Sequence, residues 1–182
     1  MTAKPPAPPA GARPASRRHA PRAEPRPPRQ AGTVRPTRPA PPLATLRPAG
    51  WAAPQGYADG IAASGRVVFV AGQVGWDPAT GAFADDDLAA QVAQALANVV
   101  AVLRTAGAEP QHVARLTWYV TDRAEYVAAR RAIGTAYRAV MGNHYPAMTL
   151  LVVHSLLEER AKVEIEATAV VPDRPATAAQ QG

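Results

Sequence analysis

Two glutamates that alternate along the last predicted strand are the clearest candidates for chemistry. In the run Lys-Val-Glu-Ile-Glu-Ala-Thr at 162–168, the alternation of polar and apolar residues places Glu164 and Glu166 on one face. A carboxylate in a partly dry cleft can act as a general acid or base, because burial raises its pKa. The alternative is a solvated sheet face with salt bridges, since antiparallel sheets often expose one polar face. The functional interpretation places a carboxylate against a ligand or another subunit.

Histidine is the other residue type that could transfer protons near neutral pH. The histidines show no metal-ligand spacing, since they fall at His19, His112, His144 and His154. The chain has no cysteine, which excludes disulfides, thiolate metal sites and a cysteine nucleophile. We therefore predict no metal and no cofactor. His144 and Tyr145 precede Pro146 and could rim a cleft; the alternative is a loop histidine beside a packing tyrosine.

Hydrophobic periodicity predicts the elements that would position these side chains. Residues 67–71 are rich in β-branched and aromatic side chains, as in a buried strand, and 64–66 form a turn between two strands. Residues 72–81 carry the Asp-Pro and Thr-Gly signals of a loop. A first helix starts within 85–87, where carboxylates can cap free amides, and ends at Gly107. Its apolar stripe has helical spacing: Leu88, Val92, Leu96, Val99 and Leu103.

The second half of the domain adds a strand, a helix and two further strands. The strand at 113–120 alternates, so Leu116, Trp118 and Val120 share one face and Arg115, Thr117 and Tyr119 share the other. A helix then starts at Asp122 and ends at Gly142, with an apolar stripe at Tyr126, Ile133, Tyr137 and Val140. Strands at 147–153 and 161–171 follow. This order predicts an α+β domain in which two helices pack on one face of a mixed sheet.

Charge and proline divide the chain into a tail and a domain. Residues 1–49 hold 14 of the 20 prolines and ten basic residues against one acid, Glu24, for a net charge of +9. Residues 50–182 hold ten basic and thirteen acidic residues, for a net charge of −3. Proline favours extended, polyproline-like conformations. We therefore expect a disordered tail at 1–49, a folded domain at 50–172 and a flexible C-terminal tail at 173–182.

The same distribution limits the partners that we expect. Phosphate binding needs clustered cations, so the mildly acidic domain argues against nucleic-acid binding except through the basic tail. No apolar run approaches the roughly 18–20 residues of a membrane span, and the N-terminus lacks the apolar core of a secretory signal. We therefore expect no membrane association and a cytoplasmic location.

Read together, these segments resemble the RidA family, also called YjgF or endoribonuclease L-PSP. The resemblance covers residues 52–171, and its motifs lie at 67–78, 94–107, 117–122, 146–147 and 163–170. It implies a chorismate-mutase-like fold with a mixed sheet of about six strands and two helices on one face. It also implies a homotrimer with ligand clefts between neighbouring subunits.

The best-known branch of this family hydrolyses reactive enamines and imines, such as 2-aminoacrylate, to a 2-keto acid and ammonia. In that branch an arginine after Pro-Ala clamps the substrate carboxylate, and a glutamate of the last strand handles a water or proton. The resemblance places the catalytic carboxylate at Glu164. It places the substrate-binding positions at Tyr57, Ala71, Gly72, Gln73 and Met148, with His144 and Tyr145 at the rim.

Two of these positions depart from the branch pattern. Ala71 stands where a serine is usual, and Met148 replaces the arginine. A thioether carries no charge and donates no hydrogen bond, and breaking a buried ion pair costs about 3–5 kcal/mol. We therefore expect poor handling of 2-aminoacrylate and altered substrate choice. Arg130 could supply another cation, although a solvated helix arginine beside Arg131 is the simpler interpretation.

Three functional classes remain open from the sequence. The first is a hydrolytic deaminase of small enamines or imines. The second is a non-catalytic, trimeric protein that binds a small metabolite, with a pocket made apolar by Ala71 and Met148. The third is RNA binding or cleavage, which the family's older name suggests and the domain's net charge of −3 disfavours.

Overall fold

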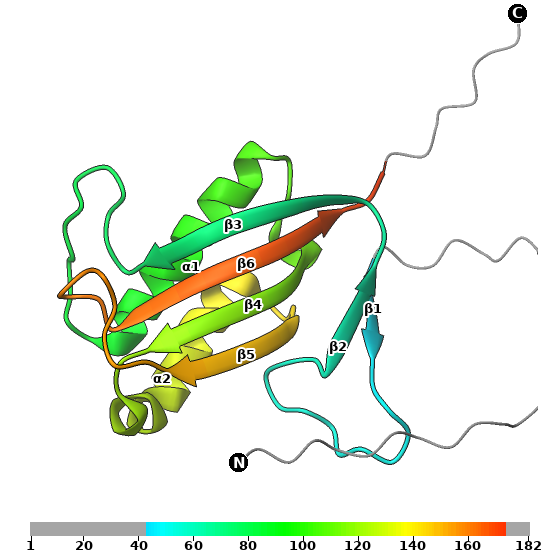
Figure 1. Cartoon of the computed structure of the whole chain (residues 1–182), viewed down its shortest axis with the longest axis horizontal. Helices are drawn as coiled ribbons and strands as arrows, with labels where there is room; N and C mark the ends of the chain where they lie inside the picture. The colour runs from blue at the N-terminus through cyan, green and yellow to red at the C-terminus, as the bar shows by residue number, and fades with distance from the viewer. Residues whose placement is uncertain (1–42, 174–182) are drawn as a thin grey trace, which may run out of the picture. The chain divides into compact units, whose positions relative to one another are not determined.

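The computed structural model describes residues 43–173, which form an α+β domain. Its elements, in chain order, are β1 (Leu43–Leu46), β2 (Gly60–Ala63), β3 (Arg66–Val74), α1 (Leu88–Thr105), a 3-10 turn (Pro110–His112), β4 (Val113–Val120), α2 (Arg123–Met141), β5 (Ala147–Val152) and β6 (Val163–Val171). One sheet has the order β3-β6-β4-β5, and β1 and β2 form a separate antiparallel pair (Figure 1). Within the larger sheet β4 and β5 run parallel, and the other neighbours run antiparallel.

The predicted fold class is confirmed, but the strands at the N-terminal end differ from expectation. β2 and β3 flank the predicted turn at 64–66 yet belong to different sheets, so they do not form a hairpin. β1 lies within 1–49, which we expected to be a disordered tail. Prolines flank β1 in the sequence but none falls inside it, so its amides can take part in the ladder with β2. The rest of the predicted tails, at 1–42 and 174–182, lies outside the described residues.

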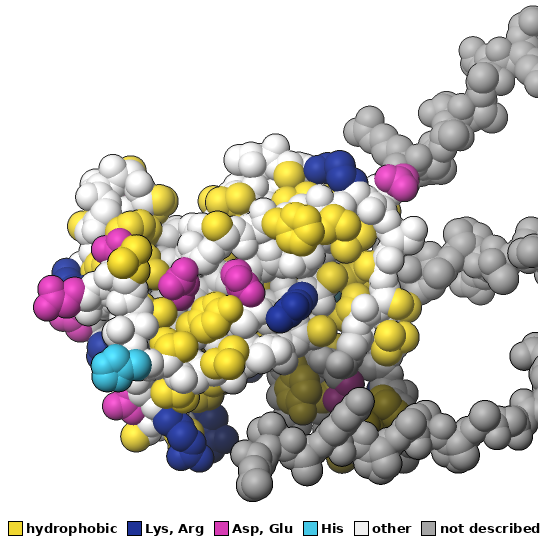
Figure 2. All heavy atoms as spheres, viewed as in Figure 1, with side chains coloured by type: hydrophobic (Ala, Val, Ile, Leu, Met, Phe, Trp, Pro, Cys, Tyr) yellow, Lys and Arg dark blue, Asp and Glu magenta, His cyan; other side chains and the backbone are white. Residues whose placement is uncertain are grey.

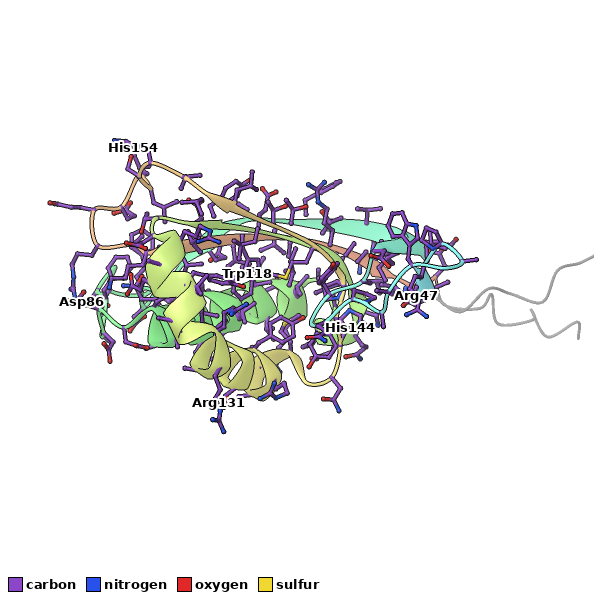
Figure 3. The ribbon with its side chains drawn as sticks, turned by 90° about the horizontal axis from the view of Figure 1, so that it is seen from below. Arg47, Asp86, Trp118, Arg131, His144 and His154 are labelled. Carbon is purple, nitrogen blue, oxygen red and sulfur yellow. The ribbon has the colours of Figure 1, made fainter. Side chains whose placement is uncertain are left out.

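Both helices lie on one side of the four-stranded sheet (Figures 1 and 3). The Asp87 carboxylate caps α1 by accepting a hydrogen bond from the Ala90 amide at 2.8 Å. In the same way, the Asp122 carboxylate caps α2 by accepting a hydrogen bond from the Glu125 amide at 2.9 Å. The predicted stripe of α1 is confirmed, because its five residues are fully buried: Leu88, Val92, Leu96, Val99 and Leu103. α2 buries fewer side chains, namely Ile133, Tyr137 and Met141. Much of its sheet-facing side is therefore free to border a cavity.

α1 is long and apolar enough to cross a membrane by length and composition alone, which the sequence analysis did not anticipate. Its apolar side chains, however, form the centre of the domain core. Val92, Leu96 and Val99 have no exposed surface and pack with Val113, Ile165 and other residues of the sheet. This burial is what the core helix of an α+β domain requires.

The sheet face opposite the helices is polar at its centre, with apolar side chains on both sides of the polar group (Figure 2). The register places Glu164, Glu166 and Thr168 of β6 beside Tyr119, Thr117 and Arg115 of β4. On β3, Phe69 pairs with Thr168 and is 79% exposed. We call this surface the open face. Val67, two residues from Phe69 on the same strand face, is 49% exposed, and neighbouring exposed apolar side chains are typical of a surface that meets another molecule.

β3 continues further than the sequence predicted. Gly72 and Gln73 were assigned to a loop, but β3 extends to Val74. The register with β6 shifts between Val70 and Gln73, as in a β-bulge, so the strand absorbs the glycine and resumes its pairing. The turn signals that predicted the loop begin only after this point.

Candidate functional site

Glu164 lies on the open face between two neighbouring strands. Its register partners are Val74 on β3 and Tyr119 on β4, and its side chain is partly buried. Among the described residues, no hydrogen bond or ion pair engages its carboxylate, whereas the nearby Lys162 is held 2.6 Å from Glu125. That hydrogen bond to Glu125 raises the pKa of Lys162. Lys162 is therefore paired with Glu125 and not with Glu164. The carboxylate is therefore available to a water or a ligand.

The bulge in β3 makes room for this carboxylate. A β-carbon built on Gly72 would collide with Glu164 Oε1 and would lie 2.6 Å from its Cδ. Any larger residue at position 72 would therefore push the glutamate aside. Gln73 braces the bulge by donating from Nε2 to the carbonyls of Ala71 at 3.2 Å and Gly72 at 3.1 Å. Ala71 and Gly72 are exposed, so a ligand that contacts Glu164 would also meet this part of β3.

A cavity of about 800 Å³ opens on the other side of the sheet, between α2, β5 and the segment before β2. We call it the tyrosine cavity. Six of the residues that line it carry the argument: Tyr57, Trp118, Tyr126, Tyr137, Tyr145 and Met148. Met148 pairs in register with Leu116, and Leu150 with Trp118, so both β5 side chains face the helices. The Ala58 amide donates to Pro146 O at 2.9 Å, which fixes the segment carrying Tyr57 beside Tyr145.

Stacked aromatic rings form one wall of the tyrosine cavity. The rings of Tyr137 and Tyr145 stack at 5.5 Å with an interplanar angle of 9°, and Trp118 lies 6.4 Å from Tyr137. The Tyr137 hydroxyl donates to His144 O at 2.7 Å. Burial raises the pKa of Tyr137, and the neighbouring Tyr145 raises it further. Tyr137 is therefore a neutral hydrogen-bond donor at physiological pH.

The His144 ring is hydrogen-bonded to the backbone at the start of β4. Its Nε2 lies 2.6 Å from Val113 O, which requires a proton on Nε2 because a carbonyl can only accept. The side chain borders a second cavity, of about 730 Å³, lined also by Asp59 and residues of β1 and β2. Figure 3 shows His144 at the end of the domain where β1 and β2 lie. The packing alternative for the histidine fits these contacts better than a place in the tyrosine cavity.

The predicted site residues divide between the two faces of the sheet. Glu164 and Gly72 lie on the open face, whereas Tyr57, Tyr145 and Met148 line the tyrosine cavity on the helix side. A single chain therefore does not bring Glu164 and Met148 together, because the sheet separates them. Within residues 43–173, no three His, Asp or Glu side chains are grouped as a metal site would need.

Several residues that line the tyrosine cavity were not predicted to belong to a site. Tyr126 and Tyr137 were interpreted as part of the apolar stripe of α2. Trp118 was placed only on one face of the strand at 113–120, together with Leu116 and Val120. All three do pack on the core, but they also line the cavity. The signal that was available is their residue type, because these three large aromatic residues lie on or beside a helix that buries few aliphatic side chains.

Comparison with known proteins agrees with this architecture. A family model described as "Endoribonuclease L-PSP" matches residues 49–171, more than half of the chain. The chain belongs to this family. The resemblance to RidA and YjgF proteins is thereby confirmed. The 2-iminobutanoate/2-iminopropanoate deaminase of Salmonella typhimurium is 34% identical over 109 residues, covering 58% of this chain and 80% of that protein.

Solved structures of family members share the fold. The conserved Rid family protein YyfB from Yersinia pestis superposes with a TM-score of 0.64 at 33% identity, covering 71% of this chain and 99% of that one. TdcF from E. coli, determined with bound serine, superposes with a TM-score of 0.52 at 28% identity, covering 65% of this chain and 91% of that one. The endoribonuclease L-PSP family therefore supplies both the fold and a set of relatives named as imine deaminases.

Proposed function

We propose that this protein is a hydrolytic deaminase of small reactive imines or enamines, with Glu164 as its acid–base group. The observation that carries the proposal is the Glu164 carboxylate, which is partly buried, unpaired among the described residues and seated over Gly72. A relative at 34% identity is named as an imine deaminase, which supports the same chemistry. A positioned acid–base group contributes about 10²–10⁴ in rate.

The reaction needs only one such group. Water adds to the carbon of the C=N bond, and the nitrogen takes up a proton. The resulting carbinolamine expels ammonia as its hydroxyl becomes a carbonyl. Glu164 would take one proton from the attacking water and pass it to the imine nitrogen. It would then take the hydroxyl proton of the carbinolamine and pass it to the departing amine, so the carboxylate is regenerated after each transfer.

We infer that the complete site forms between subunits of a homotrimer, as the family resemblance implies. Glu164, Ala71 and Gly72 of one subunit would face the tyrosine cavity of a neighbour, which supplies Tyr57 and Met148. The separation of these groups by the sheet within one chain supports this arrangement. The exposed Phe69 and Val67 on the open face also support it, because exposed apolar clusters mark contact surfaces.

The replacement of the family arginine by Met148 alters the expected substrate. Met148 sits on the helix side of β5 at the tyrosine cavity, where it offers neither charge nor a hydrogen-bond donor. A very small, charged substrate such as 2-aminoacrylate would therefore be poorly held. Substrates with more apolar surface would be favoured.

Ammonia release tests the proposal directly. Imines would be generated in place by an amino-acid oxidase, from a panel of amino acids with small apolar to large or charged side chains. Wild type and Glu164→Gln would be compared, with light scattering to establish the number of subunits. We expect turnover that falls at least 100-fold in the variant. Rates equal to the uncatalysed background across the panel would falsify the deaminase proposal.

A second candidate is a trimer that binds a small metabolite without catalysis. The apolar Ala71 and Met148 favour it, since both replace polar groups of the deaminase branch. The two candidates differ in a simple way: a binder would retain its ligand and show no Glu164-dependent ammonia release.

A further inference from the structure

The tyrosine cavity is bordered by three arginines and by no acidic residue: Arg130, Arg131 and Arg138. The ion pairs among the described residues involve other basic groups, namely Arg104, Arg160 and Lys162. Cations beside a cavity without a neutralising carboxylate attract anions, and arginine in particular presents several donors to a carboxylate.

Of the three arginines, Arg130 is better placed than the adjacent Arg131 to contact an anion in the cavity. Arg130 donates from Nε to Val127 O at 3.3 Å, which leaves its terminal N–H groups for another acceptor. Its charge also acts on the cavity wall, because it opposes the rise in the pKa of Tyr126 that burial causes. The adjacent Arg131, by contrast, points away from the sheet in Figure 3. Arg123, an exposed arginine of the same helix that does not line the cavity, provides a control position of equal charge.

Gly134 leaves space on the side of α2 that lines the tyrosine cavity, where a larger side chain would fit. Gly134 lies in the middle of the helix, where glycine is unfavourable compared with alanine, and it has no positive φ that would require glycine. A β-carbon at this position would approach only Arg138 Nη1, at 3.5 Å, which is an ordinary contact. Packing thus gives no reason for the glycine. Its effect is to leave space between Arg130 and Arg138 on the cavity side of α2.

The floor of the cavity contains an unsatisfied donor. Trp118 is 1% exposed, and its Nε1 has no acceptor among the described residues. Buried N–H groups are nearly always paired, so an unpaired one beside a cavity indicates a missing acceptor. A ligand oxygen or nitrogen could reach this N–H group only after movement of the side chains that cover it.

We propose that the tyrosine cavity binds a carboxylate that carries a large apolar or aromatic group, with Arg130 contacting the carboxylate in place of the arginine absent at position 148. The apolar group lies among Tyr126, Tyr137 and Tyr145, in the space that Gly134 leaves. This inference rests on the proposed function, for which it names the substrate class: 2-imino acids with large apolar or aromatic side chains. Arg130 determines specificity and takes no part in proton transfer.

Equilibrium binding to the full-length protein tests the inference without turnover. The probes are phenylpyruvate, its methyl ester and pyruvate, measured by calorimetry. We expect phenylpyruvate to bind at least tenfold more tightly than either of the others. The ester lacks the negative charge and pyruvate lacks the ring, so the two comparisons separate the contributions of the anion and the aromatic group.

Two arginine variants locate the anion contact. Arg130→Gln should weaken phenylpyruvate binding at least tenfold and leave the weak binding of the ester within twofold. Arg123→Gln changes the net charge equally, at a residue outside the cavity lining, and should leave both within twofold. Equal losses in the two variants would indicate general attraction by the helix surface and would overturn the assignment of Arg130.

A third variant tests the space at position 134. Gly134→Leu should fill the cavity and abolish phenylpyruvate binding, while the melting temperature stays equal or rises because leucine favours a helix. Unchanged phenylpyruvate affinity in this variant would place the ligand elsewhere and overturn the proposal, as would pyruvate binding as tightly as phenylpyruvate.

The ammonia assay separates this inference from the proposed function. Phenylpyruvate binding that depends on Arg130, without Glu164-dependent ammonia release from any imine, would retain the ligand class and reject the deaminase. Glu164-dependent turnover of small imines by a protein that does not bind phenylpyruvate would retain the deaminase and reject the ligand class.

Discussion

Gly72 lies directly against the carboxylate of Glu164, across the bulge of β3. A β-carbon on Gly72 would lie 2.6 Å from Glu164 Cδ and 2.9 Å from its Cγ. These are atoms at the end of a flexible side chain, so Gly72→Ala should turn the glutamate away and leave the backbone in place. We expect ammonia release to fall at least tenfold, while the free energy of unfolding changes by about 1 kcal/mol or less. A parallel loss of stability and activity would argue against this role for Gly72.

Gly75 provides a contrasting position three residues further along the chain. A β-carbon there would lie 2.5 Å from Gln91 Cβ and 2.6 Å from its Cα, so it would meet α1 itself. Gln91 is 1% exposed and accepts from the Lys162 amide at 2.8 Å, which ties α1 to the start of β6. Gly75→Ala should therefore lower the free energy of unfolding by about 1–3 kcal/mol in urea titrations. A change as small as that expected for Gly72→Ala would contradict this close contact.

The sequence predicted most of the fold because its elements rest on local signals. The stripe of α1 and the capping carboxylates Asp87 and Asp122 were visible as spacing and residue type, and both helices are found where they were expected. β1 was missed because four residues among prolines carry too little pattern to show that they pair with β2. The pairing depends on residues more than a dozen positions away, which periodicity does not report.

The candidate site was harder to predict, for a related reason. Alternation correctly grouped Glu164 with Glu166, but it did not show which face of the sheet Met148 would share. That depends on the parallel register of β5 with β4, which places Met148 opposite Leu116 on the helix side. Alternation also placed Trp118 on one face of β4 with Leu116 and Val120, but it could not show that the Trp118 Nε1 has no acceptor among the described residues.

Met148→Arg should restore recognition of small carboxylates. The substitution places a guanidinium in the tyrosine cavity, where a charge-assisted, bidentate contact with a substrate carboxylate can form. We expect at least a tenfold gain in kcat/KM for 2-aminoacrylate, measured as ammonia release. Met148→Gln, which has a similar length and no charge, is the matched control and should show less than a threefold gain. The absence of any gain in the arginine variant would remove Met148 from the list of specificity-determining residues.

Tyr137 should make the domain sensitive to alkaline pH. Its folded-state pKa is raised above the ordinary 10.0, chiefly by burial, so the native state holds the phenolic proton more tightly than the unfolded chain does. The resulting stability is fully present below pH 10 and is lost as the pH rises above it. Tyr137→Phe cannot ionise, but it loses the 2.7 Å hydrogen bond to His144 O.

Urea unfolding of wild type and Tyr137→Phe at pH 7 and near pH 11 separates these two effects. At pH 7 the variant should be less stable by about 0.5–1.5 kcal/mol, the usual net contribution of one hydrogen bond. Near pH 11 the difference should shrink or change sign, because only wild type has a buried phenol at position 137 to ionise. A difference that stays constant between the two pH values would show that the Tyr137 hydroxyl keeps no raised pKa in the folded protein.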